Sequence, residues 1–205
     1  MKGNYTEQEE FWVGTFGDEY TQRNQGKYLH ASNLALFSKI FSRTEKVSSV
    51  IEFGANIGLN LLAIKALRPE IEINAVEINE SAVKQLKKLD AIKVFHQSIL
   101  DFSPESEIDF VFTKGVLIHI DPDKLSDVYD LLVKTSSRYI CIAEYYNPTP
   151  VEISYRGHKG KLFKRDFAGE IMKKYPDINL IDYGFIYHRD PVFPQDDITW
   201  FLLKK

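Results

Sequence analysis

Two glycines flank a short turn after the first predicted strand. Gly54 and Gly58 enclose Ala55, Asn56 and Ile57 in the segment EFGANIG. Glycine lacks a side chain, so the backbone of such a turn can approach a ligand closely. The spacing matches neither GxGxxG, typical of dinucleotide sites, nor GxxxxGK followed by Ser or Thr, typical of phosphate loops. The turn therefore fits either a ligand site or a glycine-bounded turn of an ordinary α/β domain.

A carboxylate ends the second predicted strand. Glu77 lies 77 − 54 = 23 residues after Gly54. The carboxyl ends of neighbouring parallel strands meet at one edge of a sheet, so the two features should lie together. A carboxylate there can accept hydrogen bonds from both hydroxyls of a ribose. The alternative is an ordinary exposed acid at a strand end.

Small polar and apolar residues follow the second and third predicted strands. Ile78 comes directly after Glu77, and Ser98 and Ile99 follow the run IKVFH. Apolar side chains with a few placed polar groups are typical of small-molecule sites, and this pair suits the face and edge of an adenine. Taken alone, the segment around Ser98 could also be a plain loop.

A basic segment lies late in the chain. Five cations fall within ten residues, with no acid before Asp166: Arg156, Lys159, Lys161, Lys164 and Arg165. Such a segment could hold a carboxylate or a phosphate, and arginine favours a two-point grip. The alternative is a solvated basic loop before a helix that Asp166 caps.

Alternating strands and helices must position these residues. Apolar runs predict strands at 47–53, 71–78, 92–96, 108–113 and 138–144. Helices are expected at 28–43, at 59–68, at 79–89 with Asn79 as the cap, and after Asp121. Repeated strand–helix units predict an α/β fold with a mostly parallel sheet covered by helices on both faces. The last two strands, 178–187 and 198–205, have no helix between them and should pair antiparallel.

Composition indicates one domain over residues 1–205, with an N-terminal helical or lid segment at 1–46 and a core at 47–205. The net charge is −3, which argues against a nucleic-acid or membrane-surface binder, because those rely on a broad basic field. The single cysteine, Cys141, cannot form an internal disulfide. With no apolar leader or membrane span in the sequence, we expect a soluble cytoplasmic protein. No histidine or cysteine spacing suggests a metal, so none is expected.

Several segments resemble a known family. VIEFGANIGLN, AVEIN, QSILDF and FTKGVLIHI resemble the successive motifs of class I S-adenosylmethionine-dependent methyltransferases over residues 47–205. Asn56 stands where the commoner family loop has its middle glycine. EFWVGTFGDEYTQRN, EYYNPTPVEISYRGHKGKLFKRDFAGE and DITWFLLKK resemble a smaller group, the methyltransferases associated with pseudaminic acid and related nonulosonate sugar biosynthesis.

The resemblance implies a Rossmann-like class I methyltransferase fold, with a seven-stranded, mostly parallel sheet and a final antiparallel strand. It implies S-adenosylmethionine as the cofactor and S-adenosylhomocysteine as the product. By the resemblance, residues 114–116 would line the methionine side. The implied cofactor-binding residues are Gly54, Ala55, Asn56, Gly58, Glu77, Ile78, Ser98, Ile99, Lys114, Gly115 and Val116.

His119 is the candidate general base. Transfer of a methyl group to a hydroxyl requires removal of its proton, and the ordinary pKa of histidine suits that task. His119 lies in the segment GVLIHI after the fourth predicted strand. The alternative is a structural histidine between Ile118 and Ile120.

Aromatic and polar residues near the predicted site could bind the acceptor. Tyr145 and Tyr146 are catalytic candidates together with His119. They follow the fifth strand, where aromatic faces could contact a sugar or a cationic methyl group, although tyrosines at the edge of a core are equally compatible. Phe11, Trp12 and Phe16 belong to a segment that could form a lid or pack as a helix face on the sheet. The remaining acceptor candidates are Tyr20, Arg23, Asn147, Arg156 and His158.

The expected function is methyl transfer, to oxygen or nitrogen, on a small acidic or nucleotide-linked sugar metabolite of cell-surface glycan biosynthesis. The expected partner is therefore an anionic small molecule. Three alternatives remain: an RNA methyltransferase that uses residues 156–165 for phosphates, a nucleotide-dependent oxidoreductase or epimerase, and a non-catalytic cofactor-binding regulatory protein.

Overall fold

The computed structural model describes residues 5–23 and 27–205. Within these residues the main sheet has seven strands in the order β3-β2-β1-β4-β5-β9-β8. They are β1 (Ser49–Phe53), β2 (Glu72–Glu77), β3 (Ile92–His96), β4 (Ile108–Lys114), β5 (Ser136–Glu144), β8 (Asn179–Ile186) and β9 (Ile198–Lys204). Strands β1 to β5 pair in parallel, and β9 is antiparallel to both β5 and β8. The predicted mostly parallel sheet with a final antiparallel strand is confirmed.

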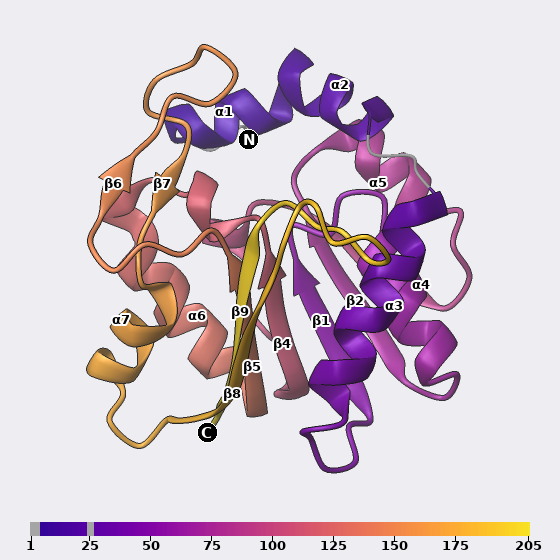
Figure 1. Ribbon diagram of the computed structural model, residues 1–205. Coiled ribbons are helices and arrows are strands. Elements are labelled where there is room, and N and C mark those ends of the chain that lie inside the picture. Colours follow the sequence, from indigo (N-terminus) through magenta and orange to yellow (C-terminus); the bar gives the residue numbers. More distant parts are fainter. Residues whose placement is uncertain (1–4, 24–26) are drawn as a thin grey trace.

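Helices cover both faces of the sheet (Figure 1). The α-helices are α1 (Glu7–Val13), α2 (Thr15–Arg23), α3 (Lys27–Phe41), α4 (Leu59–Leu67), α5 (Glu80–Leu86), α6 (Leu125–Thr135) and α7 (Phe167–Lys174). Helices α3 to α5 share one apolar core with the sheet, and α6 and α7 share the other. Helices α1 and α2 instead cross above the carboxyl ends of the strands (Figure 1). None of the helices described here has the length and apolar character needed to span a membrane.

Local sequence explains where several elements begin. Asn79 caps α5 by accepting a hydrogen bond from the Ala82 N–H (2.9 Å), as predicted. Asp166 caps α7 through the Gly169 N–H (2.9 Å). The predicted helix at 79–89 is shorter than expected, because helical geometry ends at Leu86 and a turn follows.

The basic segment folds into a hairpin that the sequence pattern did not predict. Strands β6 (Val151–Glu152) and β7 (Phe163–Lys164) pair antiparallel. At the tip, Tyr155 and His158 bridge across a turn in which Arg156 and Gly157 have φ angles of 50° and 88°. These short strands lack a clear apolar alternation, which is why residues 156–165 read as a loop.

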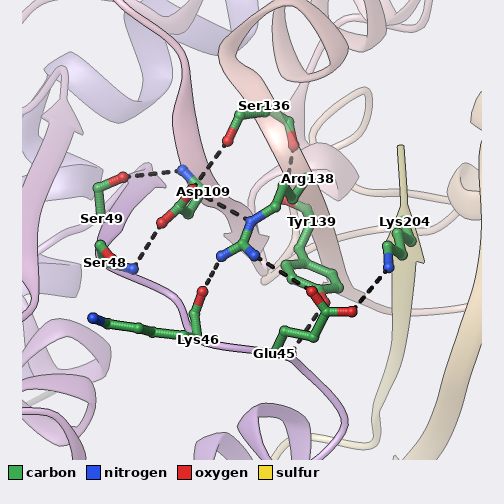
Figure 2. A network of polar contacts seen from close by, with 10 residues as sticks. Glu45, Lys46, Ser48, Ser49, Asp109, Ser136, Arg138, Tyr139 and Lys204 are labelled. Atoms are coloured by element: carbon green, nitrogen blue, oxygen red, sulfur yellow. Dashed lines mark hydrogen bonds and ion pairs between the residues drawn. The ribbon is translucent and has the colours of Figure 1, made fainter.

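A polar network lies at the amino ends of β1, β4 and β5 (Figure 2). The Arg138 guanidinium donates to the Lys46 carbonyl and contacts Asp109 (3.4 Å) and Glu45 (3.7 Å). Asp109 also accepts from the Ser48 N–H (2.8 Å). This network joins the starts of three strands at the end of the sheet opposite α1 and α2.

Candidate functional site

A pocket of about 200 Å³ lies at the carboxyl ends of β1, β2 and β4, beneath α1 and α2. It brings together most of the predicted cofactor-binding residues: Gly54, Ala55, Asn56, Glu77, Ile78, Ser98, Ile99, Lys114, Gly115 and Val116. Gly58 is outside this lining. It precedes α4 as the N-cap residue with a φ of 82°, and its Cα faces the side chains of Leu86 and Leu89.

The turn after β1 depends on left-handed backbone. Gly54 has a φ of 72°, and a Cβ placed there would lie 2.5 Å from a methyl carbon of Val116. Asn56 has a φ of 46°, which asparagine tolerates better than most residues. Its side-chain oxygen accepts a hydrogen bond from Thr21 on α2 (3.2 Å). Asparagine therefore keeps the backbone conformation that a glycine would allow and adds a contact to the helices above the pocket.

Glu77 links the end of β2 to this turn. One carboxylate oxygen accepts the Asn56 N–H (2.7 Å) and the other accepts the Asn79 N–H (2.8 Å). Burial raises the pKa of Glu77, and these backbone hydrogen bonds act in the opposite direction. A carboxylate oxygen can accept more than one hydrogen bond, so both oxygens can still receive a hydroxyl from the pocket.

A second acid, Glu52, lies below the turn. It is only 1% exposed, and Asn60 donates to its Oε1 (2.6 Å). Glu52 Oε2 and Asn60 Oδ1 are buried without a hydrogen-bond partner among the described residues. Burial raises the pKa of Glu52 to about 8, and it is the largest influence on that pKa. Because buried polar atoms are almost always paired, these two atoms require a partner, a ligand group or an ordered water, from the pocket that Asn60 lines.

Glu9 reaches the predicted adenine segment from α1. The Ser98 hydroxyl donates to Glu9 Oε1 and accepts the Leu100 N–H (3.0 Å). The other oxygen of Glu9 accepts the Thr6 N–H (2.7 Å), which completes a capping box at the start of α1. Sequence reasoning missed Glu9 as a site residue, although the spacing TxxE is a visible sign of the cap.

His119 lies between two elements. Its ring centroid is 4.7 Å from that of Trp12 on α1 and 4.9 Å from that of Tyr155 on the hairpin. Nδ1 lies 2.6 Å from the carbonyl oxygen of Lys161. A carbonyl can only accept, so Nδ1 carries the proton and Nε2 has the free lone pair. Burial lowers the pKa of His119 to about 4, so the ring is neutral at pH 7.

Glu144 holds the segment that carries His119. This buried acid at the end of β5 accepts backbone N–H groups from Val116 (3.0 Å), Leu117 (3.1 Å) and Ile118 (3.4 Å). Burial raises its pKa to about 7 against the effect of these donors. Sequence reasoning missed both Glu52 and Glu144, yet each is visible as a carboxylate at or next to the end of an apolar strand.

The predicted aromatic acceptor residues separate in space. Tyr20 lines the pocket and packs against Trp12, with ring centroids 5.1 Å apart. Tyr145 and Tyr146 are outside the lining. The Lys164 ammonium lies 5.2 Å from the Tyr145 ring centroid, and the exposed Tyr146 ring packs on Phe201.

The predicted polar acceptor residues also lie outside the lining. Arg23 pairs with Glu19 (3.3 Å), and Asn147 donates to the Thr149 carbonyl (2.6 Å). Arg156 is exposed at the hairpin tip, and the His158 ring packs against Phe11 with a centroid distance of 5.0 Å. Their proposed contacts with an acceptor stay predictions.

Solved structures share this architecture. Magnesium protoporphyrin IX methyltransferase from Synechocystis PCC 6803, with S-adenosylmethionine bound, aligns with a TM-score of 0.68 at 12% identity, covering 100% of both chains. The 1,6-didemethyltoxoflavin-N1-methyltransferase from Burkholderia thailandensis aligns with a TM-score of 0.71 at 11% identity, covering 96% of this chain and 86% of that one. The plantazolicin methyltransferase aligns with a TM-score of 0.65 at 13% identity, covering 96% and 94%.

The chain therefore has the Rossmann-like fold of these methyltransferases, as its strand order and antiparallel β9 also indicate. No protein-family model and no curated protein sequence matches it. At these identities the likeness establishes the fold, and the chemistry must be argued from the pocket itself.

Proposed function

We propose that the protein is an S-adenosylmethionine-dependent methyltransferase that acts on a small molecule. One observation carries this proposal: the Glu77 carboxylate bonds the glycine turn, while Glu52 and Asn60, on either side of that turn in sequence, leave buried polar atoms unpaired among the described residues. S-adenosylmethionine has a ribose with two hydroxyls for Glu77 and an ammonium group for Asn60 Oδ1 and, once Glu52 has released its proton, for Glu52 Oε2. The pocket thus fits the polar groups of the cofactor without requiring a phosphate site.

The charge of the pocket also supports a cationic cofactor. Acids outnumber bases in its lining, which contains Glu9, Glu77, Asp121, Asp196 and one lysine, Lys114. S-adenosylmethionine, when bound, supplies a methyl group on a positively charged sulfur, and S-adenosylhomocysteine has lost that charge. The acids favour the substrate form of the cofactor over the product form, which assists product release.

His119 is the proposed base for the acceptor. Its Nδ1–H is held by the Lys161 carbonyl, so Nε2 is the nitrogen that can take a proton from an acceptor hydroxyl. Trp12 packs on the histidine ring and, with Tyr20, lines the pocket at the side of α1 and α2. The low pKa of His119 keeps Nε2 unprotonated at neutral pH, and it also makes this nitrogen a weaker base than that of an ordinary histidine.

We further propose a sugar metabolite of the nonulosonate type as the acceptor. This finer proposal is supported by the resemblance of the segment from Glu144 to Glu170 and by the cations of the hairpin, of which Arg156 is exposed at the tip. A guanidinium can form two parallel hydrogen bonds to a carboxylate or a phosphate of such a molecule.

Two measurements test the proposal. Calorimetry should detect binding of S-adenosylhomocysteine, and incubation with methyl-labelled S-adenosylmethionine and a small-metabolite extract of the source organism should yield a labelled sugar. Labelled RNA, or binding without any transfer, would instead favour the alternative functions. Once the acceptor is known, His119→Asn should lower turnover by about 10²–10⁴-fold with cofactor affinity retained. His30→Asn, on α3 and outside the pocket lining, is the matched control.

A further inference from the structure

We propose that Lys161 is a positioning residue that ties the orientation of His119 to the docking of α1. The side chain of Lys161 contacts α1, and its main-chain carbonyl contacts the histidine ring. This inference rests on the proposed function only for the role of His119 as a base. The orientation of the ring can be measured without any methyl transfer.

The side chain of Lys161 is fixed at α1. The residue is only 7% exposed, and its ammonium lies 2.6 Å from Glu7 Oε1 and 3.1 Å from the Glu7 carbonyl oxygen. The ammonium also lies 5.4 Å from the centroid of the Phe11 ring. A buried ammonium is costly unless it is paired, so the lysine stays at α1 only while Glu7 is in place.

The backbone around Lys161 is fixed as well. The Gly160 carbonyl accepts a hydrogen bond from Gln8 on α1 (3.1 Å), and the Gly160 N–H donates to Glu152 (2.6 Å). The Leu162 carbonyl accepts the Ile153 N–H (2.9 Å). The peptide that bonds His119 is therefore held from both sides, by α1 and by the opposite strand of the hairpin.

The same two elements enclose the imidazole ring. Trp12 belongs to α1 and Tyr155 to the hairpin, and both rings pack on His119. Displacement of α1 would remove Trp12 and the anchor of Lys161 at once. The hydrogen bond partner of one ring nitrogen decides which nitrogen carries the proton, so the tautomer of His119 should depend on this docking.

Imidazole ¹⁵N NMR of the full chain tests the inference, with His119→Asn used to assign the signals. In the wild type, His119 should show a protonated Nδ1 and an unprotonated Nε2, and it should remain neutral down to a pH of about 4. Lys161→Met keeps the apolar stem and removes the ammonium. This variant should give a mixture of both tautomers and a midpoint of titration at least 1 pH unit higher, on the order of the usual spread of histidine pKa values.

Lys159→Met is the matched control, because Lys159 is exposed on the same hairpin, and it should leave the pattern unchanged. Lys161→Arg keeps the positive charge and should show most of the wild-type pattern. If the effect of Lys161→Met came from a general loss of structure, arginine would not restore that pattern. If Lys161→Met does not fold, Glu7→Gln serves in its place, since the Glu7 side chain is 76% exposed and the change removes only the charged partner. A wild-type Nε2–H tautomer, or unchanged signals in the variant used, would overturn the inference, whether or not the protein transfers methyl groups.

Discussion

Three buried carboxylates lie at or next to the carboxyl ends of β1, β2 and β5, and they differ in how many donors surround them. Glu144 accepts three backbone N–H groups, and Glu77 accepts two. Among the described residues Glu52 accepts the side-chain amide of Asn60 at one oxygen, and its other oxygen is unpaired. A fully paired carboxylate anchors the chain, whereas one with spare lone pairs can bind a ligand. By this measure Glu144 anchors the chain, whereas Glu77, which lines the pocket, and Glu52, which bonds the pocket residue Asn60, keep lone pairs for a ligand.

We expect Glu77→Gln to weaken binding of S-adenosylhomocysteine by about 1.5–3 kcal/mol, or roughly 10- to 150-fold, the range for hydrogen bonds to a charged group. The glutamine keeps one acceptor but presents an amide donor to the ribose or to a backbone N–H. Calorimetry at a temperature below the unfolding transition measures the affinity of each protein for S-adenosylhomocysteine. Glu72→Gln, at the exposed start of the same strand, should bind as the wild type does. If folded Glu77→Gln protein bound S-adenosylhomocysteine with wild-type affinity, Glu77 would not bind the ribose.

Gly54 and Gly115 allow backbone strain and side-chain overlap to be separated. Both have left-handed φ angles, 72° and 68°. A Cβ at Gly54 would meet Val116 at 2.5 Å, whereas one at Gly115 would have no atom of the described residues within 4 Å apart from its two neighbours in sequence. Gly115→Ala should therefore lower the free energy of unfolding by about 1–2 kcal/mol from strain alone. Gly54→Ala should lower it by a further 1–3 kcal/mol or so from overpacking, as measured by urea denaturation. Similar losses in the two variants would contradict the close packing of the turn on Val116.

At the scale of elements, α1 and α2 form a cover that is held by polar contacts at several points. Asp18 accepts hydrogen bonds from Ser81 (2.6 Å) and from the Asn79 side chain (3.1 Å), and both residues lie at the start of α5. The Asn79 side chain also donates to the Trp12 carbonyl (3.1 Å). Asn79 and Trp12 also line the pocket, so the contacts that hold the cover and the walls of the pocket share residues.

We expect Asp18→Ala to loosen this cover while the sheet stays intact. Loss of hydrogen bonds to a charged group of about 1.5–3 kcal/mol should speed amide hydrogen exchange of residues 5–23 by about tenfold or more. Mass spectrometry of exchanged peptides measures this, with peptides of β1 and β4 as the internal reference. Glu19→Ala is the control, because Glu19 is exposed and pairs only within α2. Unaltered exchange in the Asp18 variant would show that apolar packing alone docks the cover.

At the scale of the whole molecule, the buried acids should make stability depend on pH. Glu52 and Glu144 have pKa values of about 8 and about 7 in the fold, against an ordinary value of 4.5. The folded state therefore retains protons that the unfolded chain has released, and the stability this provides is lost as pH rises through the folded values. The fold lowers the pKa of His119, so the contribution of this residue to stability increases with pH. This increase is confined to the range between a pH of about 4 and the ordinary histidine pKa of 6.5.

The melting temperature of the ligand-free protein should consequently fall between pH about 6.5 and about 8.5, above the window of His119. Glu52→Gln should flatten that fall, because glutamine does not titrate and keeps an acceptor for Asn60. Calorimetric melting across the pH range measures both proteins. A rise in wild-type stability over this window, or the same slope in the variant, would show that Glu52 is charged in the fold.

Local pattern determined the sheet, its helical faces and much of the pocket edge. Periodicity places strands and helices, and Asn79 and Asp166 cap helices because each bonds a neighbour in sequence. Parallel strands bring their carboxyl ends together, so the turn at Gly54 and the carboxylate of Glu77 had to meet.

Only the tertiary structure determined which residues of the cover and the hairpin enclose the site. Glu9 reaches Ser98 across 89 positions, and Lys161 reaches Glu7 across 154. No periodicity encodes such pairs, and the apolar faces of α1 and α2 would suit several surfaces of the sheet. The position of Arg156 was likewise decided by the tertiary structure. Its residue type made it a candidate for the site, but the turn of the hairpin leaves it exposed at the tip. Local bonding fixes where elements begin and end, but which distant groups meet is set by how the elements pack.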